Sequence, residues 1–199
     1  MKKIILSSII GLSLFGCAST LLMDTSINDF LLLSIKTNSN DNVVLNFSSN
    51  VVDGKQVPFK KGKIPSSPGQ IGFNHTESYS LNKMAQEYMS MRFLKFGQSG
   101  GVVVDLKIRD FWVEQGIIGS FAENLFVGGS KFEVESHIDA VVTVTINGNT
   151  ETKIIKTSHS EQVDGLVGAI WEKQISVCIN KVNNKVLMVM SQFFESLNL

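Results

Sequence analysis

Five side chains of the sequence belong to the types that most often bind metal ions or act as nucleophiles: Cys17, Cys178, His75, His137 and His159. Metal sites usually draw such residues from short, regular spacings, such as two cysteines or two histidines a few positions apart. Here the histidines are scattered over an expected loop and two expected strands, and neither cysteine lies near them in the sequence. The spacing therefore predicts no metal site.

His137 lies between two acidic residues on the polar side of an expected strand, which favours a solvated surface histidine. If this strand pairs with the preceding one, we expect Lys107 and Arg109 to face Glu133, Glu135 and His137. Exposed pairs of this kind contribute about a few tenths of a kcal/mol. We interpret them as structural.

The run Gly97-Gln98-Ser99-Gly100-Gly101 contains the G-x-S-x-G pattern of a nucleophile elbow and is similar to the GDSGG run of trypsin-like proteases. A nucleophile elbow needs a strand before the serine and a helix after it, whereas here the expected order is reversed. A trypsin-like site needs a histidine and then an aspartate upstream, and His75 is the one histidine before Ser99. We interpret the run as a helix end and a turn, and assign no catalytic residue.

Cys17 directly follows a short apolar run. Lys2 and Lys3 precede residues 4–15, which are mostly apolar but too few for a membrane-spanning helix of roughly 20 residues. This arrangement is typical of a secretory signal peptide. The tetrad Leu14-Phe15-Gly16-Cys17 resembles the lipobox of bacterial lipoproteins, which implies cleavage before Cys17 and its modification with diacylglycerol and a fatty acid. No other cofactor is expected.

Ala18 follows the cysteine, and the lipobox resemblance then implies anchoring in the outer membrane with the protein facing the periplasm. We expect residues 1–16 to be a cleaved signal peptide, residues 17–28 a lipidated tether, and residues 29–199 a single domain. Cys178 then has no disulfide partner. Its place on an apolar helical stripe predicts a buried structural thiol.

The charges of the sequence balance, with 18 basic and 18 acidic residues. Loss of the two signal-peptide lysines leaves a net charge of about −2, which argues against nucleic acid as a partner because phosphate contacts need a clustered basic surface. Four lysines of an expected loop are either solvated or attract an anionic partner such as lipid headgroups or the cell-wall polymer: Lys55, Lys60, Lys61 and Lys63.

The hydrophobic pattern predicts strands, a helix, three strands and a long helix. Apolar and polar residues alternate strictly over 131–147, so one face of this strand is buried and the other is wet. The alternation slips near Asp110, which predicts a bulge. Strands are expected over 30–36, 43–49, 100–115, 131–147 and 150–162, and helices over 81–97 and 165–195. We predict an α+β fold, an antiparallel sheet of about four to five strands with two helices packed on one face.

Residues 116–129, between the two clearest strands, are unusually apolar for a connection. Their number exceeds the two to five residues of an ordinary hairpin loop. They either fold back over the core or form a patch that binds a partner or a membrane. The candidate partner-binding residues are Ile117, Ile118, Phe121, Leu125 and Phe126.

The lipobox, the strand VVVDLKIRDFWVEQ, the strand KFEVESHIDAVVTVTINGN, the strand TKIIKTSHSEQVDG and the closing helix resemble the YajG-like family of bacterial outer-membrane lipoproteins. The likeness covers roughly residues 80–199 together with the signal. It implies an envelope lipoprotein and brings no catalytic residue with it.

We predict a protein that binds and does not catalyse. The hypothesis is an accessory or assembly subunit at the outer membrane that contacts an envelope protein through residues 116–129. The alternative is a periplasmic module that binds a small ligand or the cell wall through the four lysines.

Overall fold

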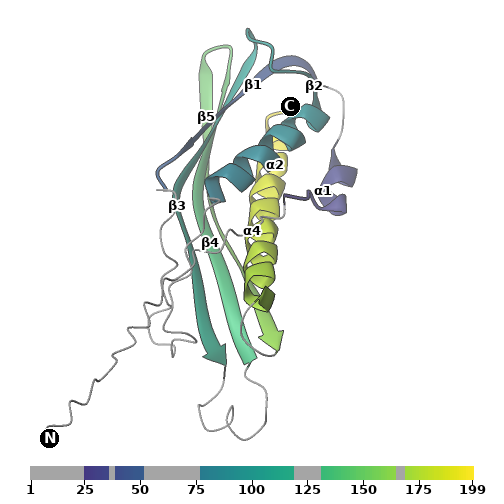
Figure 1. Cartoon of the computed structure of the whole chain (residues 1–199). Coiled ribbons are helices and arrows are strands. Elements are labelled where there is room, and N and C mark those ends of the chain that lie inside the picture. Colours follow the sequence, from purple (N-terminus) through teal and green to yellow (C-terminus); the bar gives the residue numbers. More distant parts are fainter. Residues whose placement is uncertain (1–24, 36–38, 52–76, 119–130, 165–168) are drawn as a thin grey trace, which may run out of the picture.

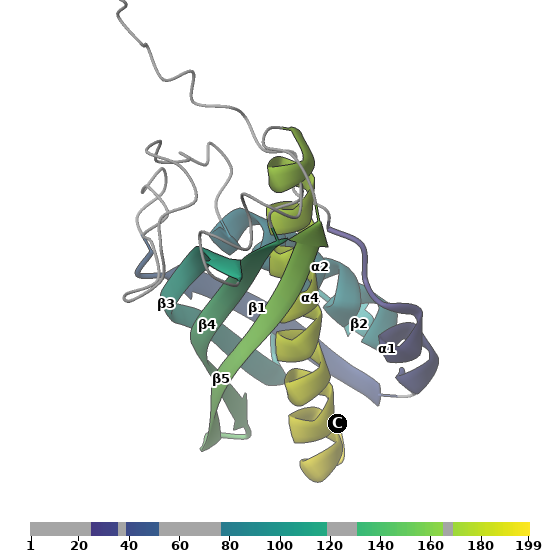
Figure 2. The same cartoon turned by 90° about the horizontal axis from the view of Figure 1, so that it is seen from below.

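Five strands form one sheet, and the helices lie on one of its faces (Figures 1 and 2). The computed structural model describes residues 25–35, 39–51, 77–118, 131–164 and 169–199. The elements are α1 (Asp29–Ser34), β1 (Ser39–Ser49), α2 (Glu77–Arg92), β2 (Phe93–Phe96), β3 (Val102–Ile118), β4 (Lys131–Ile146), β5 (Asn149–Asp164) and α4 (Ala169–Ser196). This confirms the predicted α+β class with helices on one face.

The sheet is mixed, with the strand order β2-β1-β3-β4-β5. The pairs β3–β4 and β4–β5 are antiparallel as expected, but β1 runs parallel to both β2 and β3. The register of β3 and β4 shifts between Ile108 and Asp110, which confirms the bulge. Strand β5 lies at the edge of the sheet, where polar strands such as this one are common.

Along β3 and β4, most side chains at every second position are apolar and point into the core. The inward residues of β3 and β4 are almost inaccessible and meet the apolar stripe of α4, which includes Ile175, Cys178, Ile179, Val182, Val186 and Met190. Each large apolar side chain contributes about 1.5 to 3 kcal/mol on burial. None of the described helices is both long and apolar enough to cross a membrane.

Residues 29–34 form helix α1, and the expected strand over 30–36 was wrong. The carbonyl of Asn28 accepts hydrogen bonds from the N–H groups of Leu31 and Leu32, which closes the first turn. Leu31 is buried while Leu33 is 87% exposed. A short apolar run cannot distinguish a strand from a helix by its periodicity, and the packing of α1 on α4 decides it.

The expected helix over 81–97 was too long. Helix α2 ends at Arg92, and Phe93–Phe96 form strand β2 along the edge of β1. The turn that follows requires glycine, since Gly97 and Gly100 have positive φ angles of 85° and 103°. A Cβ on Gly101 would lie 2.4 Å from the carbonyl oxygen of Asn42. The run around Ser99 is therefore a turn, although a strand and not a helix precedes it.

Arg92 is buried at the junction of α2, β2 and α4. Its guanidinium donates hydrogen bonds to the Tyr88 hydroxyl at 3.1 Å, the Ser191 hydroxyl at 3.2 Å and the Leu199 carbonyl oxygen at 2.8 Å. The guanidinium carbon also lies 5.6 Å from the ring centroid of Phe194. Burial raises the pKa of Tyr88, so this hydroxyl stays protonated beside the cation. Arg92 thus links both helices to the C-terminal residues.

Replacing Arg92 with methionine keeps much of the apolar volume but leaves its three acceptors without their donor. We expect Arg92→Met to lower the free energy of unfolding by about 2 to 4 kcal/mol, measured by urea denaturation. The matched control is Lys95→Met on exposed β2, with an expected change below about 0.5 kcal/mol. Equal effects of the two variants would contradict the role assigned to Arg92.

Candidate functional site

The face of the sheet opposite the helices carries a cluster of two carboxylates, an imidazole and an indole, which are side chains able to bind a ligand or a metal ion. In the β3–β4 register, Trp112 lies opposite His137 and Glu114 lies opposite Glu135. Residues two apart on a strand point to the same face, so the four side chains form two neighbouring cross-strand pairs. Val113, between Trp112 and Glu114, is buried on the other face.

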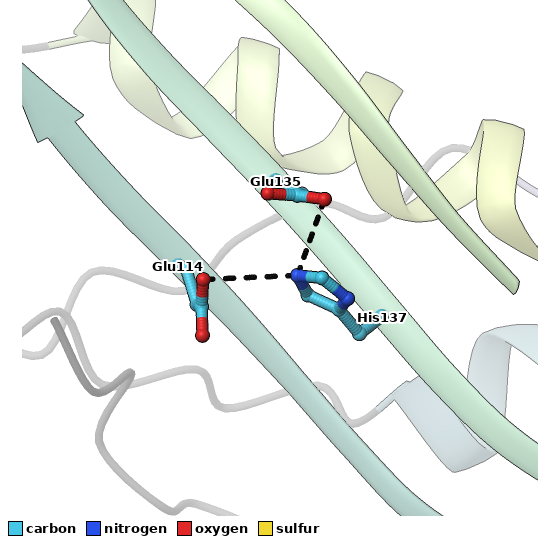
Figure 3. Close-up of side chains that lie close together, drawn as sticks. All are labelled: Glu114, Glu135 and His137. Atoms are coloured by element: carbon cyan, nitrogen blue, oxygen red, sulfur yellow. Dashed lines mark ion pairs between the residues drawn. The ribbon is translucent and has the colours of Figure 1, made fainter. Parts of the chain in front are cut away.

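His137 lies between the two carboxylates (Figure 3). Its Nε2 atom is 3.5 Å from Oε1 of Glu135 and 3.8 Å from Oε2 of Glu114. The Trp112 ring stacks on the imidazole, with centroids 4.6 Å apart and planes 6° from parallel. The His137 side chain is 20% exposed, and its Nε2 atom is buried without a hydrogen-bond partner among the described residues. His137 is therefore a fixed, half-buried group, and the expected solvated surface histidine was wrong.

The expected contacts of Lys107 and Arg109 with Glu133, Glu135 and His137 were also wrong. The strands pair from Val102 opposite Ile146, which places both basic residues beside positions 139 to 141 of β4 and not beside positions 133 to 137. Lys107 lies opposite Val141, and Arg109 donates hydrogen bonds to Oδ1 of Asp139 at 2.8 and 2.5 Å. Beyond the register shift between Ile108 and Asp110, Glu114 lies opposite Glu135, where the register before the shift would have placed Val113.

Sequence spacing predicted no metal site, and it missed this cluster because its members come from two strands. Glu135 and His137 alternate on one strand, as do Trp112 and Glu114 on the other. The alternation alone could indicate that each pair shares a face. Only the position of the bulge brings the two pairs together.

A second group of polar residues lines a cleft of about 630 Å³ between α4, β5 and residues 26–31. His159 lies 2.8 Å from Oε1 of Glu161, and Lys181 donates a hydrogen bond to the same oxygen. The hydrogen bond from Lys181, together with that from His159, lowers the pKa of Glu161. Lys185 donates to the carbonyl oxygen of Ser158 at 2.6 Å.

On the other side of this cleft, two asparagines of α4 form hydrogen bonds with residues 26–28. The side-chain amides of Asn180 and Asn184 donate to the Ser26 carbonyl oxygen at 2.9 and 3.1 Å. The Asn28 N–H donates to the side-chain oxygen of Asn184 at 2.7 Å, and Ile27 belongs to the hydrophobic core. Residues 26–28, which we expected at the end of a tether, are thus packed on α4.

Cys178 is a buried thiol, as predicted. Its Sγ donates to the carbonyl oxygen of His159 at 3.0 Å, and it is fully inaccessible. Burial raises the pKa of the thiol, which disfavours the thiolate that a nucleophile needs. Cys178 is a packing residue.

The other candidates from the sequence lie outside the part of the chain whose side chains the structure describes. Ile117 and Ile118 belong to β3, so the first three residues of the expected 116–129 loop lie in a strand. The remaining candidates lie outside the described residues altogether: Cys17, Lys55, Lys60, Lys61, Lys63, Phe121, Leu125 and Phe126.

Comparison with known proteins identifies no family for this chain. No protein-family profile matches it, and no curated protein matches its sequence. A protein of the DUF330 family from Xanthomonas campestris is similar in structure, with 9% identity and a TM-score of 0.49 over 89% of this chain and 97% of that one.

Two further solved structures are similar over most of their length. A minor lipoprotein from Acinetobacter baumannii has 8% identity and a TM-score of 0.40, over 81% of this chain and 95% of that one. The rare lipoprotein B from Shewanella oneidensis has 12% identity and a TM-score of 0.42, over 78% and 99%. Likenesses at this level assign no function to the chain.

The lowered pKa of Glu161 makes a prediction about acid stability. A carboxylate with a lowered pKa stabilises the fold above its unfolded pKa, and this contribution is lost as the pH falls through its folded pKa. We expect Glu161→Gln to lower the free energy of unfolding by about 0.2 to 1 kcal/mol at about pH 7, and this deficit to shrink as the pH falls below the ordinary carboxyl range, in urea titrations. Glu151→Gln, exposed on the same strand, is the control. A deficit that persists undiminished in acid would contradict the assignment.

Proposed function

We propose that this protein is a lipid-anchored subunit of the bacterial cell envelope that acts by binding another protein. It is attached to the outer membrane through acylated Cys17 and faces the periplasm. The sequence supports this with the basic start, the apolar run and the tetrad Leu14-Phe15-Gly16-Cys17. The resemblance to the YajG-like lipoproteins gives the same compartment.

Acylation supplies the membrane affinity that this proposal needs. Each buried CH₂ of an acyl chain contributes about 0.8 kcal/mol, so that one chain binds only marginally and two or more anchor a protein stably. A diacylglycerol and a fatty acid on Cys17 supply three chains. The anchor therefore needs no contribution from the folded domain.

Replacing Cys17 tests the anchor. We expect Cys17→Ala, expressed as the full chain in a Gram-negative host, to lose acylation and to leave the membrane fraction. Cell fractionation and mass spectrometry of the N-terminal peptide measure both effects. Cys178→Ala is the matched control because it removes the other cysteine and should stay acylated and membrane-bound. An unmodified Cys17 in the native protein would contradict the proposal.

The observation that carries the binding role is the length of the β3–β4 hairpin. The two strands stay paired from Val102 opposite Ile146 to Ile118 opposite Lys131, and residues 119–130 connect their ends. The pairing continues five residues past Val113, which belongs to the core. Segments that connect two strands are common binding sites, and the sequence of residues 119–130 is rich in large apolar residues.

Serine substitutions in this connection test the binding role. We expect a variant with Phe121, Leu125 and Phe126 changed to serine to lose a partner that the native protein captures from detergent-solubilised envelopes. The matched control changes three exposed apolar residues of the described surface to serine: Leu33, Leu94 and Ile154. It should capture the partner normally, with all three proteins equally folded by circular dichroism. Undiminished capture by the loop variant would contradict the proposed contact.

The cleft between α4, β5 and residues 26–31 favours a second candidate, a module that binds a small ligand or the cell wall. Its volume of about 630 Å³ and its mixed lining suit a small molecule. The four loop lysines would add affinity for an anionic polymer. The test replaces these lysines with glutamine: Lys55, Lys60, Lys61 and Lys63. This candidate would be favoured if the native protein binds purified cell wall in a salt-sensitive manner and the variant does not.

A further inference from the structure

We propose that Glu114, Glu135 and His137 bind a divalent transition-metal ion, with zinc as the best fit. One imidazole nitrogen and one oxygen from each carboxylate lie within 4.8 Å of one another. The inference rests on the described side chains of β3 and β4 and does not depend on residues 119–130 or on the lipid anchor.

The two distances from Nε2 of His137 to the carboxylate oxygens are close to those between ligands of a shared ion. Nitrogen and oxygen atoms bound to a tetrahedral zinc at about 2.0 to 2.2 Å lie roughly 3.3 to 3.6 Å from one another. Nε2 of His137 is 3.5 Å from Glu135 and 3.8 Å from Glu114. Direct charge-assisted hydrogen bonds would instead bring these atoms to about 2.7 to 2.9 Å. An inward movement of Glu114 by a few tenths of an ångström would bring its oxygen within the separation of zinc ligands from Nε2.

The orientation of His137 supports the same conclusion. Its Nε2 atom points between the two carboxylates (Figure 3) and is buried with no hydrogen-bond partner among the described residues. The parallel stacking of Trp112 fixes the plane of the ring. A buried imidazole nitrogen without a hydrogen bond is costly unless something binds it, and a metal ion satisfies it directly.

The charges of the cluster also suit a divalent cation. Glu114 and Glu135 lie directly opposite each other, and like charges at such positions destabilise a sheet. A divalent ion neutralises both carboxylates and converts their repulsion into a bridge between β3 and β4.

The ligand types narrow the choice of ion. Imidazole favours zinc and its first-row neighbours over magnesium and calcium, and carboxylates are acceptable zinc ligands. Three protein ligands leave one position of a tetrahedral ion for water or for a donor from another molecule. All three ligands come from the paired strands β3 and β4.

Calorimetric titration tests the site. The full chain, purified in detergent and stripped with a chelator, is titrated with zinc chloride at neutral pH. We expect one ion per chain with a dissociation constant in the micromolar range or below, and a rise in the melting temperature when zinc is added. His137→Gln and Glu135→Gln should each weaken binding at least tenfold and reduce the rise in melting temperature.

His159→Gln is the matched control, because His159 also lies beside a glutamate but shares it with Lys181. It should bind zinc like the native protein. Glutamine at position 135 keeps the shape of glutamate, so weaker binding by Glu135→Gln reports the loss of a ligand. Circular dichroism checks that this variant is still folded. The proposal is overturned if the native protein shows no saturable binding, if both site variants bind normally, or if His159→Gln loses as much affinity as His137→Gln.

Discussion

The pairing of β3 with β4 is the interaction on which the rest of the structure depends. These strands have 17 and 16 residues, and apolar and polar side chains alternate along both. A slip of one residue would turn the apolar set toward solvent, so burial against α4 fixes the register. The helices can then cover one face of the sheet, and the other face is left for polar groups. The bulge between Ile108 and Asp110 is the one adjustment that this pairing makes.

That adjustment determines the chemistry of the helix-free face. Beyond the bulge, Glu114 meets Glu135 and Trp112 meets His137. Before it, the same face carries both neutral and charged contacts, such as the 3.2 Å hydroxyl pair of Thr143 and Thr152 and the 2.9 Å hydrogen bond from Asn46 to Asp105. The cluster therefore exists because of a backbone irregularity. Bulges are known to redirect side chains at functional positions.

Long-range periodicity made the long elements predictable from the sequence, and tertiary packing decided the short ones. Strict alternation predicted β4, interrupted alternation predicted β3, and the apolar stripe with Cys178 predicted α4. The run over 30–36 was misassigned because its packing against α4 decides its form. Strand β2 was missed because its form depends on pairing with β1 and on the packing of Phe93 against Phe194. The parallel pairing of β1 has no local signature. For the candidate site, each strand's contribution could be read from alternation, but the register that unites Glu114 with His137 could not.

Hydrogen exchange of the β3–β4 amides tests the central claim most directly, because it reports how far the hairpin is formed as one unit. The account predicts that amides beyond the bulge, over residues 111–114 and 134–138, exchange with protection similar to those of residues 102–108 and 140–146, by the same cooperative opening. Rapid exchange confined to the segments beyond the bulge would contradict it. The hairpin would then not be a rigid base for either the Glu114–His137 cluster or the connection at its end.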